Sequence, residues 1–133
     1  MKDRMGREID YMRFSITDRC NLRCKYCMPE GIDCMPRWDV LSLEEFEAIA
    51  IAAASVGIKN IKVNGGEPLA RKSCPQLVKM LKNIPGIEKV TLTTNGVQLD
   101  QYLDQLLDAG LDAINVSLDT LDPVLYEKIT GRD

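Results

Sequence analysis

The chain has 133 residues, a length that suits one domain, and 45% of them are hydrophobic, so it can bury a core. The net charge of −3 disfavours sequence-independent binding of nucleic acid, and no apolar run approaches the roughly 20 residues of a membrane span. The N-terminus lacks the apolar segment of a signal peptide, so we expect a cytoplasmic protein without a membrane partner. The absence of histidine excludes mixed Cys/His zinc sites and acid–base catalysis by histidine.

The N-terminal third predicts an arm, a strand and a long loop. Residues 1–10 are polar and irregular, as is typical of a flexible arm. Apolar and polar residues alternate over 11–17, which predicts a strand. A cysteine-rich loop follows, and residues 28–40 continue it without clear periodicity.

The rest of the chain alternates helix and strand. Ser42-Leu43-Glu44-Glu45 is a capping box that begins a helix, and Gly57 ends it. Further strands are expected over 59–63, 89–93 and 112–118, separated by helices that begin near Pro75 and Leu99. Asp122-Pro123 begins a last, short helix.

Strands that alternate with helices predict right-handed βαβ units, and hence an α/β fold with a parallel sheet. Such sheets, open or closed as barrels, bind ligands at the carboxyl ends of the strands, where the unusual loops of this chain fall. Four parallel strands of a barrel leave an open edge. We therefore expect an incomplete TIM-type barrel, with residues 1–133 as the N-terminal part of a larger protein.

Three of the five cysteines, Cys20, Cys24 and Cys27, fall within eight residues. Thiols this close together, flanked by basic residues, favour metal binding, and three of them suit an iron–sulfur cluster that keeps one iron open. Spacing alone leaves two alternatives. One is structural zinc with Cys34 or Cys74 as the fourth ligand, and the other is a redox pair of Cys24 and Cys27.

The other strand-ending loops carry weaker signals. In Gly65-Gly66-Glu67-Pro68 the glycines let a ligand approach the backbone and the carboxylate can accept from an ammonium, although such a run also makes an ordinary turn. Thr94-Asn95-Gly96 is more typical of a plain turn. Ser117 and Asp119 fit either a ligand site or a turn that begins a helix.

Together these motifs resemble the radical S-adenosylmethionine superfamily. Its cluster motif is Cys-x3-Cys-x-aromatic-Cys, with Tyr26 here in the aromatic place, and its methionine-binding turn is similar to residues 65–68. More narrowly, the GTP 3′,8-cyclase family of molybdenum cofactor biosynthesis is similar to the runs 15–29, 92–96, 115–121 and 128–132. The resemblance covers nearly the whole chain and implies roughly the first half of a radical S-adenosylmethionine barrel.

The resemblance implies a [4Fe–4S] cluster held by Cys20, Cys24 and Cys27, with S-adenosylmethionine chelating the fourth iron. Cleavage of the sulfonium by one electron would release a 5′-deoxyadenosyl radical that takes the 3′-hydrogen of GTP, and the ribose radical then attacks C8 of guanine. No residue is assigned as an acid or base. The residues implied to contact or shape the S-adenosylmethionine site are Tyr26, Gly65, Gly66, Glu67 and Ser117.

Arg13, Lys62 and Thr93 match family positions that contact GTP, although from the residues alone either cation fits an ordinary solvated side chain. Two positions depart from the family pattern. Lys62 stands where arginine is usual, which replaces a planar fork with a point charge. Asn64 stands where threonine is usual.

The implied partners are GTP, an electron donor such as flavodoxin or ferredoxin, and the downstream cyclic pyranopterin monophosphate synthase; a homodimer is compatible with the resemblance. The family's C-terminal cysteines, which carry a second [4Fe–4S] cluster, are absent from this sequence. We therefore expect that this chain alone does not turn over GTP. The alternatives are another radical S-adenosylmethionine enzyme, which modifies a peptide or a cofactor, and a non-catalytic zinc or redox module.

Overall fold

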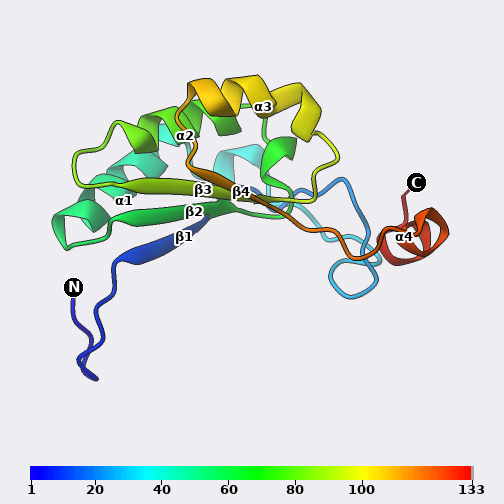
Figure 1. The fold of residues 1–133 in the computed structure, drawn as a ribbon, viewed down its shortest axis with the longest axis horizontal. Helices are drawn as coiled ribbons and strands as arrows, with labels where there is room; N and C mark the ends of the chain where they lie inside the picture. Colours follow the sequence, from blue (N-terminus) through cyan, green and yellow to red (C-terminus); the bar gives the residue numbers. More distant parts are fainter. Residues whose placement is uncertain (133) are drawn as a thin grey trace.

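A computed structural model describes residues 1–132 of the chain. Four parallel strands form one sheet in chain order: β1 (Tyr11–Ser15), β2 (Asn60–Asn64), β3 (Lys89–Thr94) and β4 (Ala113–Val116). The helices are α1 (Leu43–Ser55), α2 (Cys74–Lys82), α3 (Leu99–Asp108) and α4 (Pro123–Thr130), with short 3-10 helices η1 (Arg37–Asp39) and η2 (Pro68–Ala70). Helices α1, α2 and α3 cover one face of the sheet (Figure 1). The predicted parallel α/β fold is confirmed.

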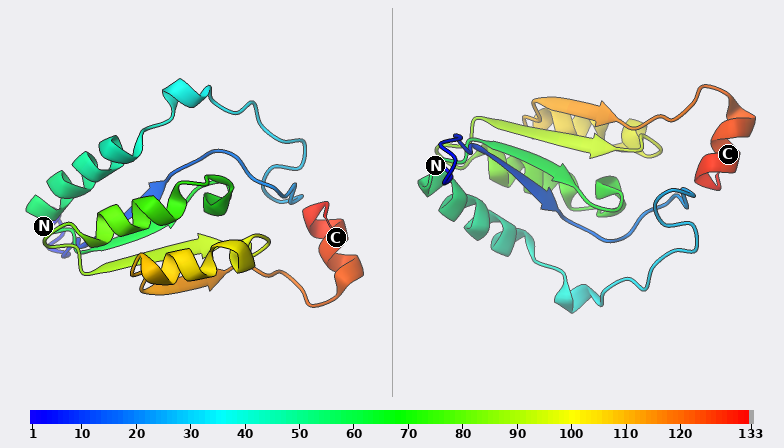
Figure 2. Two further views of the ribbon diagram at one scale, coloured as in Figure 1. Left: turned by 90° about the horizontal axis from the view of Figure 1, so that it is seen from above. Right: turned by 90° about the horizontal axis from the view of Figure 1, so that it is seen from below.

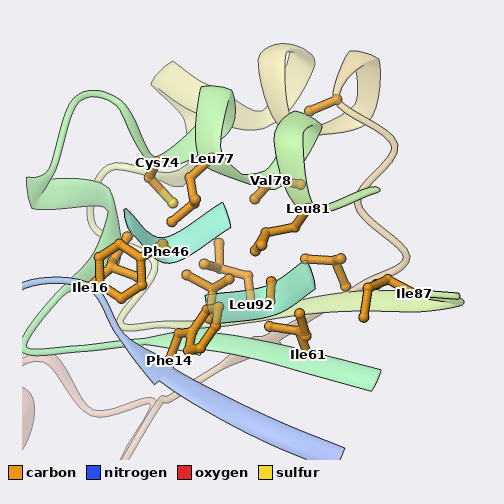
Figure 3. Close-up of a cluster of buried hydrophobic side chains, with 14 of the residues drawn as sticks. Phe14, Ile16, Phe46, Ile61, Cys74, Leu77, Val78, Leu81, Ile87 and Leu92 are labelled. Atoms are coloured by element: carbon orange, nitrogen blue, oxygen red, sulfur yellow. The ribbon is translucent and has the colours of Figure 1, made fainter. Parts of the chain in front are cut away.

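The two faces of the sheet differ because side chains alternate along each strand. Ile61, Val63, Val90 and Leu92 point toward the helices and are buried. Together with residues of α1 and α2 they form a single core between the sheet and the helices (Figure 3). The opposite face is polar, and we call it the open face; its residues include Arg13, Ser15, Lys62, Asn64, Thr91, Thr93 and Asn115.

The predicted helix starts at Ser42 and Asp122 are confirmed by their caps. The Ser42 hydroxyl accepts a hydrogen bond of 3.2 Å from the backbone N–H of Glu45, whose carboxylate accepts one of 2.7 Å from the backbone N–H of Ser42. Asp122 caps α4 by accepting from two backbone N–H groups, and Gly131 ends that helix in the left-handed region at φ 70°. These local signals need no tertiary contact to act.

One prediction at the N-terminal end was wrong in detail. The first strand ends at Ser15, because the chain then turns to bond with the loop after β2. Within residues 1–10 the Asp3 carboxylate accepts from the backbone N–H of Met5 and Arg7 and pairs with the Arg7 side chain, which closes a small hairpin; the flexible arm expected there stays a prediction. No helix within residues 1–132 is long and apolar enough to cross a membrane.

Candidate active site

The loops that follow the four strands meet at one end of the sheet, which we call the rim. The cysteine loop, residues 17–28, leaves β1 at this rim. The carbonyl oxygen of Cys24 accepts hydrogen bonds from the backbone N–H groups of Cys27 (2.9 Å) and Met28 (3.1 Å), so two of the three cysteines lie at the ends of one tight turn. The sulfur of Cys20 accepts from the backbone N–H of Leu22 at 3.5 Å. All three predicted ligands therefore belong to one short, hydrogen-bonded segment.

The five thiols fall into distinct environments. None forms a disulfide; Cys20 and Cys24 are half-buried and Cys27 is exposed. Cys74 lies in the core, where burial raises the pKa of its thiol to about 12, with Glu67 adding to the effect. Cys34 is exposed and borders, with Cys20, a hollow of about 450 Å³. Of the two predicted fourth ligands for zinc, Cys34 lies near the loop and Cys74 belongs to the apolar core.

The three sulfur atoms do not converge. Within residues 1–132 no group of three or more acidic, histidine or cysteine side chains is arranged to hold a metal ion. Free thiols do not attract one another, so the hydrogen bonds of the loop decide where they lie. Soft thiol donors on one loop, none of them tied up in a disulfide, nevertheless fit the chemistry of an iron–sulfur cluster.

The Gly-Gly-Glu-Pro turn after β2 is hydrogen-bonded to the cysteine loop. The backbone N–H of Gly66 donates to the carbonyl oxygen of Thr17, and that of Glu67 donates to the carbonyl oxygen of Arg19, both at 2.7 Å. A Cβ at position 65 would lie 2.6 Å from the Thr17 oxygen, and one at position 66 would collide with the backbone of Arg19. The close approach that these two glycines allow is thus an approach of protein backbone.

Glu67 is only 2% exposed, and its carboxylate ties two rim loops together. One oxygen accepts from the backbone N–H of Leu69 (3.0 Å) and from the hydroxyl of Thr94 (2.6 Å), and the other accepts from the backbone N–H of Asn95 (2.8 Å). A carboxylate offers about four lone-pair positions, so one remains. The three protein donors explain why a charge is tolerated at this depth.

The loop after β3 reaches the cysteine loop through a pair of asparagines. The side-chain N–H of Asn95 donates to the side-chain oxygen of Asn21 at 2.7 Å, and the Asn95 oxygen accepts from the backbone N–H of Val97. Asn21 lies between the first two cysteines in the sequence. Glu67, Asn95 and Asn21 therefore link three rim loops in series.

The loop after β4 and helix α4 are also hydrogen-bonded to the cysteine loop. The Tyr26 hydroxyl donates to the Asp119 carboxylate at 2.8 Å, and this hydrogen bond, with burial and the neighbouring Cys24, raises the pKa of Tyr26. The backbone N–H groups of Arg23 and Lys25 donate to carbonyl oxygens at the end of α4, at 2.8 and 2.9 Å. Helix α4 thus lies beside the cysteine loop, beyond the end of the sheet (Figure 2). Every other rim loop holds the segment that carries the cysteines.

Arg71 anchors the start of the cysteine loop. Its guanidinium donates to the carbonyl oxygens of Ile16 (2.8 Å) and Leu41 (2.9 Å) and lies 5.6 Å from the centroid of the Phe46 ring. These contacts join the end of β1 to the residues just before α1. Nothing in the sequence pattern distinguishes this arginine from a solvated one.

The open face brings together the residues that the resemblance assigned to GTP. Arg13 pairs in register with Lys62, which pairs with Thr91, so the two cations lie side by side on neighbouring strands. One step nearer the rim, Ser15 pairs with Asn64, and Thr93 pairs with Asn115. The Asn64 side-chain oxygen and the Thr93 hydroxyl are buried without a hydrogen-bond partner among residues 1–132. Two cations therefore lie side by side across β1 and β2. The residues with unsatisfied polar atoms, Asn64 and Thr93, lie nearer the rim.

The predicted residues for S-adenosylmethionine lie around the rim rather than at one point. Ser117 follows β4, and its backbone N–H donates to the carbonyl oxygen of Thr94 at 2.8 Å. Tyr26 is exposed, whereas Gly65 and Gly66 are half-buried beneath the cysteine loop. Contacts of these residues with a ligand stay predictions. Sequence reasoning missed the structural roles of Asn21, Asn95 and Arg71, and treated the Asn95 segment as a plain turn.

Comparison with known proteins finds relatives that share one name, GTP 3′,8-cyclase. The chain is 52% identical over 131 residues to the GTP 3′,8-cyclase of Alkaliphilus metalliredigens, covering 98% of this chain and 41% of that protein. It is 50% identical over 131 residues to the GTP 3′,8-cyclase of Pelotomaculum thermopropionicum, covering 98% and 40%. The chain thus spans about 40% of the length of the curated relatives it matches.

Solved structures share the fold. SuiB of Streptococcus suis bound to S-adenosylmethionine superposes with a TM-score of 0.74 at 21% identity, over 92% of this chain and 28% of that one. BtrN in complex with AdoMet and 2-DOIA gives a TM-score of 0.66 at 22% identity, over 83% and 46%. At these identities the likeness shows the fold alone. The parallel sheet is thus an open four-stranded part of a TIM-type barrel.

The family follows from the length of the match. The family model of the Radical SAM superfamily matches residues 14–133, from β1 through the last residue. The matched region holds the cysteine loop, the Gly-Gly-Glu-Pro turn and all four strand-ending loops that meet at the rim. By this match, which extends over more than half of its length, the chain belongs to the radical SAM superfamily.

Proposed function

We propose that this chain is the cluster-bearing, N-terminal barrel part of a GTP 3′,8-cyclase. Cys20, Cys24 and Cys27 would hold a [4Fe–4S] cluster, and the rim around them would bind S-adenosylmethionine. When bound, the cluster and S-adenosylmethionine supply the one-electron chemistry. The protein's own task is to bind, orient and shield the reacting molecules.

One observation carries this proposal: the cysteine loop is hydrogen-bonded to the loops after β2, β3 and β4 at the edge of a cationic, polar sheet face. A structural zinc loop needs no such arrangement beside a binding surface. The 52% identity with a GTP 3′,8-cyclase directs the choice of substrate to GTP. The shared length of 41% means that the complete reaction also depends on residues beyond those matched here.

Each group of residues has a separate role in the proposal. Arg13 and Lys62 would bind the phosphates of GTP, and Thr93 would contact its nucleoside part. Tyr26, Gly66 and Ser117 would contact S-adenosylmethionine from three sides of the rim. Gly65 gives the turn its close approach to Thr17, and Glu67 would shape the site of the amino group through its remaining lone pair.

Several partners belong to the same proposal. A reducing protein such as flavodoxin or ferredoxin would deliver the electron, and a cyclic pyranopterin monophosphate synthase would take the product. A second [4Fe–4S] cluster would be carried by residues outside this sequence. We propose a cytoplasmic location, in which free thiols stay reduced, and we keep a homodimer as the assembly to test.

Anaerobic reconstitution with iron and sulfide tests the cluster. We expect about four irons per chain, a brown chromophore, and cleavage of S-adenosylmethionine to 5′-deoxyadenosine under reduction. Retention of GTP on the reconstituted protein is measured by equilibrium dialysis. Tight binding of zinc without charge-transfer absorbance would contradict the proposal.

Cysteine variants distinguish the iron–sulfur cluster from the zinc site. In the zinc site Cys34 would be the fourth ligand, since it borders the same hollow as Cys20. We expect Cys20→Ala to abolish cluster assembly and Cys34→Ala to leave the iron content unchanged. Cys74→Ala is the matched control, because that thiol belongs to the core. Loss of the cluster in Cys34→Ala would mean that four thiols hold the metal and that no iron is open.

A further inference from the structure

The two unsatisfied polar atoms of the open face lie on adjacent strands. Val63 of β2 pairs with Leu92 of β3, so the residues that follow them, Asn64 and Thr93, are neighbours on the same face. The Asn64 side-chain oxygen and the Thr93 hydroxyl are buried, and neither has a partner among residues 1–132. An unsatisfied buried polar group costs about 1–3 kcal/mol. A ligand with hydrogen-bonding groups would remove this cost.

The two cations farther from the rim restrict the charge and the shape of such a ligand. Arg13 and Lys62 precede Ser15 and Asn64 by two residues on β1 and β2, a spacing of about 6.6 Å along a strand. A ligand that lies along the strands thus meets two cations first and two neutral hydrogen-bonding groups nearer the rim. A nucleotide has this order, with phosphate at one end and ribose hydroxyls next to it.

The two unsatisfied atoms differ in the hydrogen bonds that they can make, and this restricts the ligand group that fits both. The Asn64 oxygen can only accept, whereas the Thr93 hydroxyl can donate or accept. Both residues are half-buried and lie on the open face, so rotation about χ1 or χ2 would bring these atoms to its surface. A ribose hydroxyl donates to an amide oxygen and accepts from a threonine hydroxyl at the same time. Phosphate offers no donor at neutral pH, so it cannot pair with the Asn64 oxygen and is better matched to Arg13 and Lys62.

We propose that Asn64, together with Thr93, recognises a ribose hydroxyl of the bound nucleotide and makes this surface selective for ribonucleotides. The inference rests on the proposed function, because it takes GTP as the nucleotide, and it adds a specificity-determining residue. The sugar then lies at the rim end of the open face, next to the cysteine loop, while the phosphates lie deeper on Arg13 and Lys62.

The test compares GTP with 2′-deoxy-GTP and 3′-deoxy-GTP in equilibrium binding to the reconstituted chain. The wild-type chain should bind one deoxy analogue about tenfold more weakly than GTP, as expected for one lost hydrogen bond. Asn64→Leu, which is nearly isosteric, should bind GTP about tenfold more weakly and show no preference for the hydroxyl. Asn64→Asp keeps an acceptor and should keep the preference, although its charge lowers the affinity for all three nucleotides.

Asn60→Leu is the matched control, because Asn60 lies on the same strand and the same face at the end away from the rim. It should keep both affinity and preference. Full discrimination between GTP and both deoxy analogues in Asn64→Leu would overturn this inference alone. Equal binding of all three nucleotides by the wild-type chain would also overturn it. Failure of the wild-type chain to bind GTP at all would overturn the proposed function as well.

Discussion

The side-chain N–H of Asn95 donates to the side-chain oxygen of Asn21 at 2.7 Å, which joins residues 74 positions apart in the sequence. The backbone N–H of Asn95 also donates to the buried carboxylate of Glu67. Asn95 therefore connects the cysteine loop to Glu67. Asn21 immediately follows Cys20, so the contact fixes the loop where its first cysteine lies. The segment that reads as a plain turn thus positions the predicted cluster ligands.

Removal of this hydrogen bond should destabilise both the fold and the bound cluster. Asn95→Ala should lower the free energy of unfolding by about 1 kcal/mol, the usual net value of one hydrogen bond, and should speed the loss of iron from the reconstituted protein. Urea unfolding and the decay of the cluster absorbance measure the two effects. Asn83→Ala, an exposed asparagine at the end of α2, is the control and should change neither. Equal iron retention in wild type and Asn95→Ala would show that the pair does not position the loop.

Glu67→Gln should be strongly destabilising. The glutamine side chain has only one acceptor oxygen for the three donors that now reach the carboxylate, so at least one buried donor loses its partner. We expect a loss of about 1–3 kcal/mol in the free energy of unfolding, measured by urea denaturation. The exposed Glu30→Gln provides the reference and should lie within about 0.5 kcal/mol of wild type. A small effect at position 67 would mean that its charge serves a ligand more than the fold.

Gly66→Ala should separate the turn after β2 from the cysteine loop. A Cβ at this position collides with the backbone of Arg19, which cannot move aside as a flexible side chain would. We expect a destabilisation of at least about 2 kcal/mol and a failure to retain iron. Gly6→Ala is informative beside it, because that glycine has a positive φ but open space around it, so the variant carries backbone strain alone. A Gly66→Ala protein no less stable than Gly6→Ala would contradict the close approach.

Asp112 should make stability depend on acid. Burial by itself raises the pKa of its carboxyl, but hydrogen bonds from the Lys82 side chain (2.9 Å) and the Val90 backbone N–H (2.7 Å) outweigh burial and lower the pKa below its ordinary value of 3.8. Because the folded pKa is the lower one, the carboxylate stabilises the fold above pH 3.8, and this contribution is lost as the pH falls through the folded pKa.

The corresponding variant is Asp112→Asn. It should be less stable than wild type by about 0.5–1 kcal/mol at pH 7, since the pair with Lys82 is partly exposed, and the difference should shrink as the pH is lowered past 3.8. Denaturant unfolding at a series of pH values measures this difference. Asp104→Asn, exposed in the middle of α3, should show no such trend. A difference that stays constant down to pH 3 would rule out the proposed origin.

The sequence predicted the local features well, because each is decided within a few residues. The capping box at Ser42, the cap at Asp122 and the alternation that buries Ile61 and Val63 all appear as expected. The topology followed from the order of helices and strands, and it placed the four special loops at one rim. The resemblance placed Arg13 and Lys62 in one site, and the strand register makes them neighbours.

The remaining features depend on contacts between distant segments. The hydrogen bond between Tyr26 and Asp119 joins residues 93 positions apart, and nothing local to either residue announces it. The burial of Glu67 follows from the loops that close over it, since a Gly-Gly-Glu-Pro run is compatible with an exposed turn. The docking of α4 on the cysteine loop likewise depends on where β4 releases the chain. Such contacts need the assembled fold.

The electron paramagnetic resonance spectrum of the reduced, reconstituted chain, recorded with and without S-adenosylmethionine, shows whether one iron of the cluster is open to that molecule. If Cys20, Cys24 and Cys27 alone hold the cluster, one of its irons is left without a protein ligand. We expect the signal of a reduced [4Fe–4S] cluster that changes shape when S-adenosylmethionine is added, and no signal in Cys20→Ala. A cluster signal that S-adenosylmethionine leaves unaltered would mean that no iron is open, and would contradict the proposed three-cysteine site.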